Sequence, residues 1–139
     1  QGIPGASATI DRGNGFHQAV DGKVVIDASL TANFNRAEGL SVTENLLQSH
    51  PGIKGIFAHN DEMALGAVEA AASAGKKVFI VGFDATDDAV KAVEDGRMAA
   101  TVAQQPAEMG KLSVQTAVKI VGGGTVPSSL PVVVTLIKK

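Results

Sequence analysis

The stretch GIFAHNDEMALGAVEAAASAGKKVFIVGFD, residues 55–84, decides the fold. It opens with a short apolar run that ends on Asn60, continues with an alanine-rich segment at helical spacing, and closes with a second apolar run that ends on Asp84. Two short apolar runs on either side of a helical pattern are typical of a βαβ unit, in which a helix joins two parallel strands. The stretch therefore predicts an α/β protein.

The same alternation continues outward from this unit in both directions. Apolar spacing, capping residues and Gly or Pro stops predict helices over Ser7–Val20, from Asn35 to the stop at His50, from Met63 to Ala74, around Ala89–Val93, and from Pro106 to Ile120. Short β-branched or apolar runs predict strands over Val24–Leu30, up to Asn60, up to Asp84, over Ala99–Gln104, and over Val132–Ile137. We expect a doubly wound, mostly parallel sheet of flavodoxin-like type.

The start of the chain does not fit a complete sheet of this kind. Gly2-Ile3-Pro4-Gly5 is turn chemistry and a helix follows it, whereas a doubly wound sheet normally begins with a strand. The chain also begins at Gln1, without an initiator Met or a charged and apolar leader. We therefore expect a fragment or a processed product whose first strand is missing.

Composition limits the function classes that remain. The 139 residues are 45% hydrophobic, carry a formal charge of -2 and include no Cys, which fits one domain and excludes disulfides and thiolate metal sites. Lys and Arg do not cluster, so we expect no nucleic-acid surface. No apolar run approaches the roughly 20 residues that a membrane helix needs.

Polar side chains follow three of the predicted strands where each strand ends. Ligands of open α/β sheets bind at the carboxyl ends of the strands, so Asn60, Asp84 and Gln104 are expected on one rim. A carboxylate accepts from adjacent hydroxyls, and amides both donate and accept. Arg12 adds a planar donor, and Phe34 offers a flat face for ring carbons. This set predicts a site for a neutral sugar.

Each of these residues also has an ordinary structural explanation. Asn60 is a good cap for a helix that begins at Asp61, and Asp84 fits an acid in a loop or a cap. Arg12 fits a solvent-facing helix residue, Phe34 fits a core residue, and Gln104 fits a polar loop residue. Their shared position on one rim favours binding.

Patterns that would indicate an enzyme, a metal or a cofactor are missing. His17, His50 and His59 include no pair at the i, i+4 spacing of a helical metal site, and solvent or capping roles are expected for them. Asp87 and Asp88 fall where a helix begins, where acids favour the helix dipole. No phosphate-binding loop, nucleophile elbow or zinc-protease motif occurs. We expect no catalytic residue, no metal and no cofactor.

Several ordered motifs together resemble one family. They are Gly2-Ile3-Pro4-Gly5-Ala6-Ser7-Ala8, Asp11-Arg12-Gly13, Asn60-Asp61-Glu62-Met63-Ala64-Leu65-Gly66-Ala67, Val81-Gly82-Phe83-Asp84 and Ala103-Gln104-Gln105-Pro106. This set closely resembles the C-terminal part of periplasmic D-ribose-binding proteins, the receptors of ribose ABC importers. Family members usually read Phe-Asp-Arg where this chain has Phe34-Asn35-Arg36, and Asp-Gly where it has Asp84-Ala85.

The resemblance implies what the residues do and how the chain is divided. The positions of Arg12, Phe34, Asn60, Asp84 and Gln104 contact the sugar in that family. Residues 1–104 would form the C-terminal sugar-binding lobe, residues 105–132 a helix and linker packed on an absent N-terminal lobe, and residues 133–139 a returning strand. Two lobes would close over the sugar about a hinge, without covalent chemistry.

The resemblance also implies partners and a location. The partners would be a monosaccharide such as D-ribose, the membrane permease of an ABC importer, and either the missing N-terminal lobe or a second copy, with no nucleic acid among them. The location would be periplasmic, or extracellular and membrane-anchored in a Gram-positive organism. Two other classes stay open. One is the effector-binding core of a lactose-repressor-type regulator, and the other is an enzyme on a flavodoxin-like scaffold.

Overall fold

A four-stranded mixed sheet organises the chain, and the computed structural model describes all residues 1–139. The sheet order is β1-β2-β3-β4, with β1 (Gly55–Phe57), β2 (Phe79–Phe83) and β3 (Ala100–Ala103) parallel to one another and β4 (Thr135–Lys138) antiparallel to β3. The predicted α/β fold with a mostly parallel sheet is confirmed. The predicted βαβ unit is β1, α3 (Asp61–Ser73) and β2.

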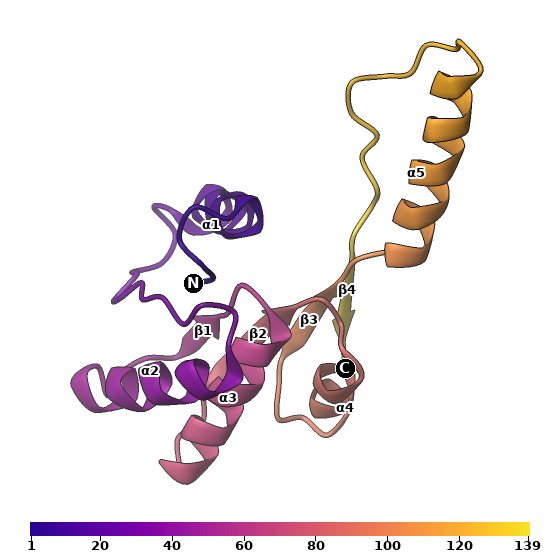
Figure 1. The fold of residues 1–139 in the computed structure, drawn as a ribbon. Coiled ribbons are helices and arrows are strands. Elements are labelled where there is room, and N and C mark those ends of the chain that lie inside the picture. Colours follow the sequence, from indigo (N-terminus) through magenta and orange to yellow (C-terminus); the bar gives the residue numbers. More distant parts are fainter.

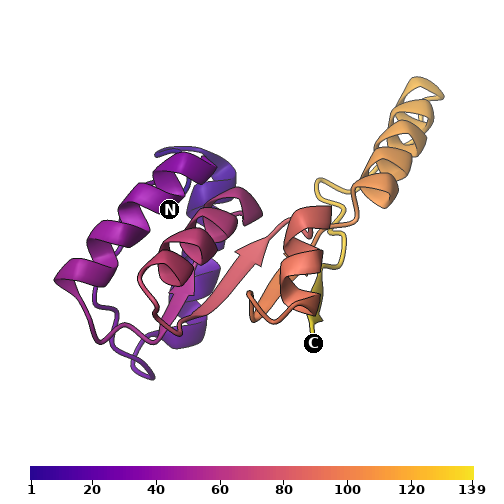
Figure 2. The same cartoon turned by 90° about the horizontal axis from the view of Figure 1, so that it is seen from below.

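Helices cover both sides of this sheet. In the two views α1 (Ser7–Val20) lies on one side of β1 and β2, and α2 (Arg36–Ser49) and α3 lie on the other (Figures 1 and 2). The rings of Phe16 on α1 and Phe57 on β1 stack with centroids 5.2 Å apart. The fourth helix, α4 (Asp87–Glu94), packs beside β3. No helix is both long and apolar enough to cross a membrane.

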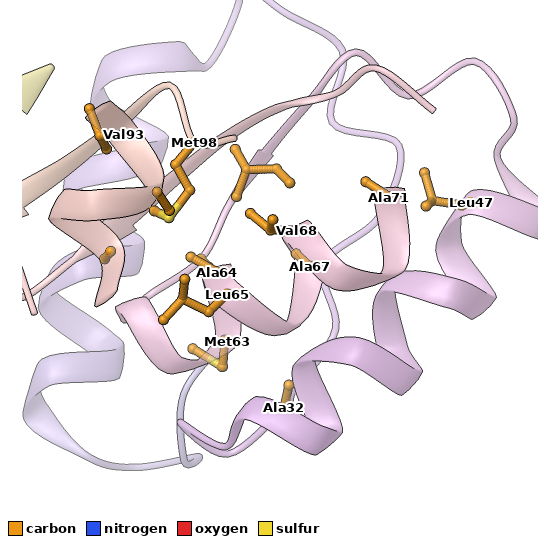
Figure 3. Packing of buried hydrophobic residues seen from close by; sticks show 14 residues of the cluster. Ala32, Leu47, Met63, Ala64, Leu65, Ala67, Val68, Ala71, Val93 and Met98 are labelled. Carbon is orange, nitrogen blue, oxygen red and sulfur yellow. The ribbon is translucent and has the colours of Figure 1, made fainter. Parts of the chain in front are cut away.

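The core is built from the alanine-rich face of α3. Figure 3 shows Ala64, Ala67, Val68 and Ala71 along this helix, packed in one cluster with residues of α2, β2 and α4. Small side chains are needed because α2 and α3 approach closely: a Cβ on Gly66 would lie 2.2 Å from the carbonyl oxygen of Arg36. The helix-stop signals also hold, since Gly75 and Gly96 follow α3 and α4 with φ of +61° and +76°.

The predicted strand from Val24 to Leu30 is wrong. The segment runs in an extended course but pairs with no strand. Strand pairing needs a neighbour, and a cavity of about 650 Å³ separates this segment from β1. The only ladder-like backbone bonds near it are made by Gln1, whose amino group donates to Leu30 and whose carbonyl accepts from Ala32.

The last helix stands away from the rest of the molecule. Figure 1 shows α5 (Pro106–Val121) projecting beyond the sheet, with the connection to β4 running back beside it. No residue of α5 is buried, and Val114, Val118 and Val121 are exposed. The returning strand begins at Thr135, later than predicted, because Thr135 pairs with Ala103, the last residue of β3. The chain before it has no β3 residue left to pair with.

Candidate functional site

The carboxyl ends of β1, β2 and β3 bring the predicted polar side chains together. Asn60 follows β1, Asp84 follows β2 directly, and Gln104 follows β3 directly. The backbone nitrogen of Asp84 donates to the carbonyl of Val102 at 2.8 Å, which extends the β2–β3 ladder to the site itself. The position of Asp84 therefore depends on the sheet and not on a free loop.

Asp84 is the centre of the hydrogen bonding at this rim. Its Oδ1 accepts from Gln104 Nε2 at 2.6 Å and from Arg12 Nη2 at 3.0 Å. No protein donor contacts Oδ2, and the side chain keeps 30% of its surface exposed. One carboxylate oxygen is thus fixed by the protein, and the other is available to a hydroxyl donor.

Arg12 reaches the rim from α1 and is held in a fixed plane. Nη1 donates to the backbone carbonyl of His59, and the guanidinium carbon lies 4.0 Å from the centroid of the Phe83 ring. The ring of Phe34 lies further away, at 6.0 Å. The Arg12 side chain is only 14% exposed, so the interpretation of Arg12 as a solvent-facing residue is wrong.

Asn60 and Phe34 are linked through the backbone. Asn60 Oδ1 accepts from the backbone nitrogen of Met63 at 3.0 Å, so the cap role expected for Asn60 is confirmed. Its Nδ2 donates to the carbonyl of Phe34 at 3.3 Å. Phe34 is half-buried against the core and lies in the left-handed region with φ of +59°. A sugar-binding role for these two side chains stays a prediction.

A buried carboxylate behind the rim was missed by the sequence analysis. Asp61 is fully buried at the start of α3, where its Oδ1 accepts from Thr101 Oγ1 at 2.6 Å and its Oδ2 from the backbone nitrogen of Thr86 at 2.8 Å. Burial raises the pKa of Asp61, while the hydrogen bonds from Thr101 and Thr86 oppose that rise. The only sequence signal was an acid at the start of an alanine-rich helix, and the neighbouring Glu62 gives the same signal without being buried.

This buried network supports the turn that carries Asp84. Thr101 Oγ1 also accepts from the backbone nitrogen of Ala85 at 3.2 Å, so Thr101 bridges Asp61 and the turn. Asp84 and Ala85 both have positive φ, +115° and +52°, a conformation that costs non-glycine residues energy. The neighbouring hydrogen bonds therefore hold a strained turn in place.

His59 departs from the solvent or capping role expected for the histidines. Its side chain is buried, and Nδ1 accepts from the backbone nitrogen of Gly2 at 3.3 Å. The pKa of His59 is lowered to about 4, first by burial and then by the positive charges of the Gln1 amino group and Arg12. The ring is therefore neutral at pH 7 and accepts at Nδ1.

The rim combines groups suited to a small polyhydroxylated molecule. It offers a partly exposed carboxylate, together with an amide and a guanidinium that both donate to one of its oxygens, and aromatic rings lie beside them. Neutral hydroxyl groups need such paired donors and acceptors. No three His, Asp or Glu side chains gather in an arrangement that would hold a metal ion.

Comparison with known proteins identifies the family to which the chain belongs. Residues 1–125 match the periplasmic binding protein domain. The chain is 56% identical over 133 residues to the ribose import binding protein RbsB of Haemophilus influenzae, covering 95% of this chain and 46% of that protein. It is 49% identical over 130 residues to RbsB of Bacillus subtilis, covering 94% and 43%.

A solved structure agrees with the sequence relatives. A periplasmic solute-binding protein of an ABC transporter from Actinobacillus succinogenes, with bound D-allose, superposes with a TM-score of 0.94 at 34% identity. The match covers 99% of this chain and 50% of that chain. The chain spans about half the length of the relatives it matches. The resemblance drawn from the motifs is confirmed, and the chain belongs to the periplasmic binding protein domain family.

Proposed function

We propose that this chain is the sugar-binding lobe of an import receptor for D-ribose or a closely related monosaccharide. The observation that carries the proposal is the arrangement at Asp84, where Arg12 and Gln104 hold Oδ1 and leave Oδ2 without a protein donor. The similar proteins are named for ribose import, and the similar structure holds D-allose. These names favour a monosaccharide over other molecules whose hydroxyl or amine groups could donate hydrogen bonds to the Asp84 carboxylate.

Each site residue has a definite role in this proposal. Asp84 accepts from a sugar hydroxyl at its free Oδ2, Gln104 and Arg12 donate to ring or hydroxyl oxygens, and Asn60 offers its amide to a further hydroxyl. The ring of Phe34 lies against the carbon face of the sugar. Binding is reversible and involves no covalent step, so the chain acts as a receptor and not as an enzyme.

A second lobe, a permease and an extracytoplasmic location complete the proposal. One lobe supplies part of the hydrogen bonds and leaves the sugar wet on its open face, so this chain alone binds weakly. The exposed apolar residues of α5, such as Val114 and Val118, fit packing against a second lobe. A receptor of this class delivers sugar to the membrane permease of an ABC importer from the periplasm, or from the outer face of a Gram-positive cell.

The alternative is the effector-binding core of a lactose-repressor-type regulator, which shares this type of fold. The similar proteins of Haemophilus influenzae and Bacillus subtilis are both named import binding proteins, which favours the receptor. The gene that encodes the longer protein distinguishes the receptor from the regulator. A DNA-binding helix pair encoded ahead of this chain would decide for the regulator.

Isothermal titration with D-ribose tests the proposal, with D-allose, D-galactose and D-xylose as comparisons. We expect selective heat with D-ribose, and a loss of affinity of about 10- to 100-fold in Asp84→Asn, the factor that corresponds to a hydrogen bond to a charged group. Asp87→Asn is the matched control, since Asp87 is exposed and makes no side-chain hydrogen bond. Equal heats for all sugars, or no heat from either this chain or the full-length protein, would contradict the proposal.

A further inference from the structure

Three successive backbone amides lead from the end of β2 into α4, and their acceptors differ. The nitrogen of Asp84 donates to a backbone carbonyl of β3. The nitrogen of Ala85 donates to the side chain of Thr101, with 3.2 Å to Oγ1. The nitrogen of Thr86 donates to the side chain of Asp61, with 2.8 Å to Oδ2. Beyond Asp84, two buried side chains therefore replace the backbone partner that a strand would supply.

The turn depends on these acceptors because its backbone is strained. Only four non-glycine residues of the chain have positive φ, and two of them are Asp84 at +115° and Ala85 at +52°. Such conformations persist only where the surrounding structure fixes them. The dihedral angles of the turn set the direction in which the Asp84 side chain leaves the backbone. The position of its free Oδ2 therefore depends on whatever fixes the turn.

Asp61 serves this turn and not the helix that it begins. It is the first residue of α3, but the cap of that helix is Asn60, which accepts from Met63. The oxygens of Asp61 accept from other elements instead. Oδ1 accepts from Thr101 on β3 at 2.6 Å, and Oδ2 accepts from the nitrogen and the hydroxyl of Thr86 at 2.8 and 3.2 Å. The carboxylate thus connects α3, β3 and the start of α4.

Two neighbouring residues accommodate this carboxylate. Thr86 precedes α4, where a threonine hydroxyl commonly caps the helix, but here the hydroxyl makes no cap bond and donates to Asp61. Gly82 lies against Oδ1, and a Cβ at that position would collide with the oxygen. Asp61 is fully buried and cannot touch a ligand, and a buried carboxylate is costly unless donors satisfy it. Its donors come from the turn and from the strand beside it.

We propose that Asp61 is a positioning residue for sugar binding, which acts through the backbone of the turn at Asp84. This inference rests on the proposed function, because it concerns the carboxylate that binds the sugar there. Without Asp61, the Thr86 amide has no acceptor and the strained turn relaxes. Asp84 then presents Oδ2 in another direction. The affinity for the sugar falls, although no residue that touches the sugar has changed.

An amide at position 61 restores part of this role. The oxygen of an asparagine accepts from Thr86, and its nitrogen donates to Thr101 Oγ1, which has a second lone pair besides the one used by Ala85. The hydroxyl proton of Thr101 then has no acceptor, and the negative charge is lost. We therefore expect affinity to fall in the order native chain, Asp61→Asn, Asp61→Ala.

Isothermal titration of the chain with D-ribose measures this order, at a temperature where each variant is folded. We expect a loss of about threefold in Asp61→Asn and of about tenfold or more in Asp61→Ala. Glu62→Gln is the control for charge, because Glu62 is the next acid of the same helical turn, is partly exposed and bonds to Arg36. Leu47→Ala is the control for stability, because Leu47 is a core residue in the last turn of α2. Both controls should keep the native affinity.

A second measurement follows Asp84 without any sugar. The side-chain amide of Gln104 donates to Asp84 Oδ1 at 2.6 Å, so its NMR signals move when the carboxylate moves. We expect these signals to move in Asp61→Ala, to move less in Asp61→Asn, and to stay in place in the two controls. If the native chain binds no D-ribose, the proposed function fails, and the Gln104 signals still decide the role of Asp61.

Three results would overturn the proposal. The first is native D-ribose affinity in a folded Asp61→Ala variant. The second is native Gln104 signals in both Asp61 variants. The third is a loss of affinity in Leu47→Ala as large as that in Asp61→Ala, which would mean that affinity follows stability alone. If Asp61→Ala does not fold, Asp61→Asn supplies both measurements, and native affinity together with native Gln104 signals in that variant would overturn the proposal.

Discussion

Arg12 and Asp84 form a 3.0 Å ion pair although 72 residues separate them in the sequence. The pair joins α1 to the end of β2, and the same guanidinium donates to the carbonyl of His59 beyond the end of β1. Arg12 therefore connects one helix to the ends of two strands through its hydrogen bonds. The orientation of the Asp84 carboxylate, and with it the direction of its free Oδ2, depends on the hydrogen bond from Arg12.

Arg12→Lys is expected to weaken D-ribose binding by about tenfold or more. Lys has no planar fork to donate to Asp84 and His59 together and does not stack on Phe83 as a guanidinium does. Isothermal titration checks the affinity. Arg97→Lys is the control, because Arg97 is exposed and paired only with the nearby Asp95. Equal affinities in the two variants would show that Arg12 does not shape the site.

Thr101→Val is expected to lower the free energy of unfolding by about 1.5 to 3 kcal/mol. The substitution keeps the shape of the side chain but removes the 2.6 Å bond to Asp61 and the acceptor for the Ala85 nitrogen. Urea unfolding followed by circular dichroism measures the change, since the chain has no Trp or Tyr.

Thr9→Val gives a matched comparison for that substitution. Thr9 is also buried, but its Oγ1 has no hydrogen-bond partner. Removing an unsatisfied buried hydroxyl is expected to leave stability unchanged or to raise it. If Thr9→Val and Thr101→Val destabilise the chain equally, the loss comes from packing and the Asp61 network has no special role.

Ala85→Gly is expected to stabilise the chain by about 1 kcal/mol. Ala85 has φ of +52°, a conformation that glycine adopts without the Cβ penalty. Ala74→Gly is the control, because Ala74, the residue that follows α3, has a helical φ of -80°, where glycine costs backbone entropy and relieves no strain. The expected sign is therefore opposite at the two positions. A loss of stability in both variants would mean that Ala85 is not strained.

Stability is expected to fall between pH 6.5 and about 4 because of His59. The pKa of His59 is lowered to about 4 in the folded chain, mainly by burial, against about 6.5 when unfolded. The unfolded state therefore takes up the proton first as the pH falls, so the contribution of this group is present above pH 6.5 and is lost toward pH 4. Urea unfolding at a series of pH values measures the slope.

Two variants separate His59 from the other titrating groups. In His59→Asn, which keeps an acceptor for Gly2, the fall in stability over this range should be shallower. Gln18→Asn, at an exposed position on α1, places the same residue type in the chain without removing a titrating group, so its slope should match that of the native chain. Asp61 acts in the opposite direction, because its pKa is raised, and it is present in all three proteins. Identical slopes in all three would contradict the assignment to His59.

Local signals were enough to predict most of the fold. Asn35 caps α2 by accepting from the backbone nitrogen of Glu38, Pro106 opens α5, and Gly75 follows α3. Each of these depends on residues a few positions apart in the sequence. The convergence of Asp84 and Gln104 was also predictable, because parallel strands end at the same edge of a sheet.

Contacts between distant elements could not be predicted in the same way. Segment 24–30 has the composition of a strand, but pairing depends on a neighbour that no local pattern supplies. The bond from Thr101 to Asp61 joins residues 40 positions apart, and its role at Ala85 follows only from the turn geometry. The stacking of Arg12 on Phe83 likewise requires α1 to cross the end of β2.

NMR titration of the ¹⁵N-labelled chain with D-ribose tests the central claim most directly, because it detects weak binding and locates it. We predict saturable shifts of the Asp84 amide, the Asn60 and Gln104 side-chain amides and the Arg12 guanidinium, and none on the far side of α3. Absence of shifts up to tens of millimolar sugar, the range of very weak binding, in both this chain and its longer parent would contradict the claim. So would saturable shifts confined to other parts of the chain.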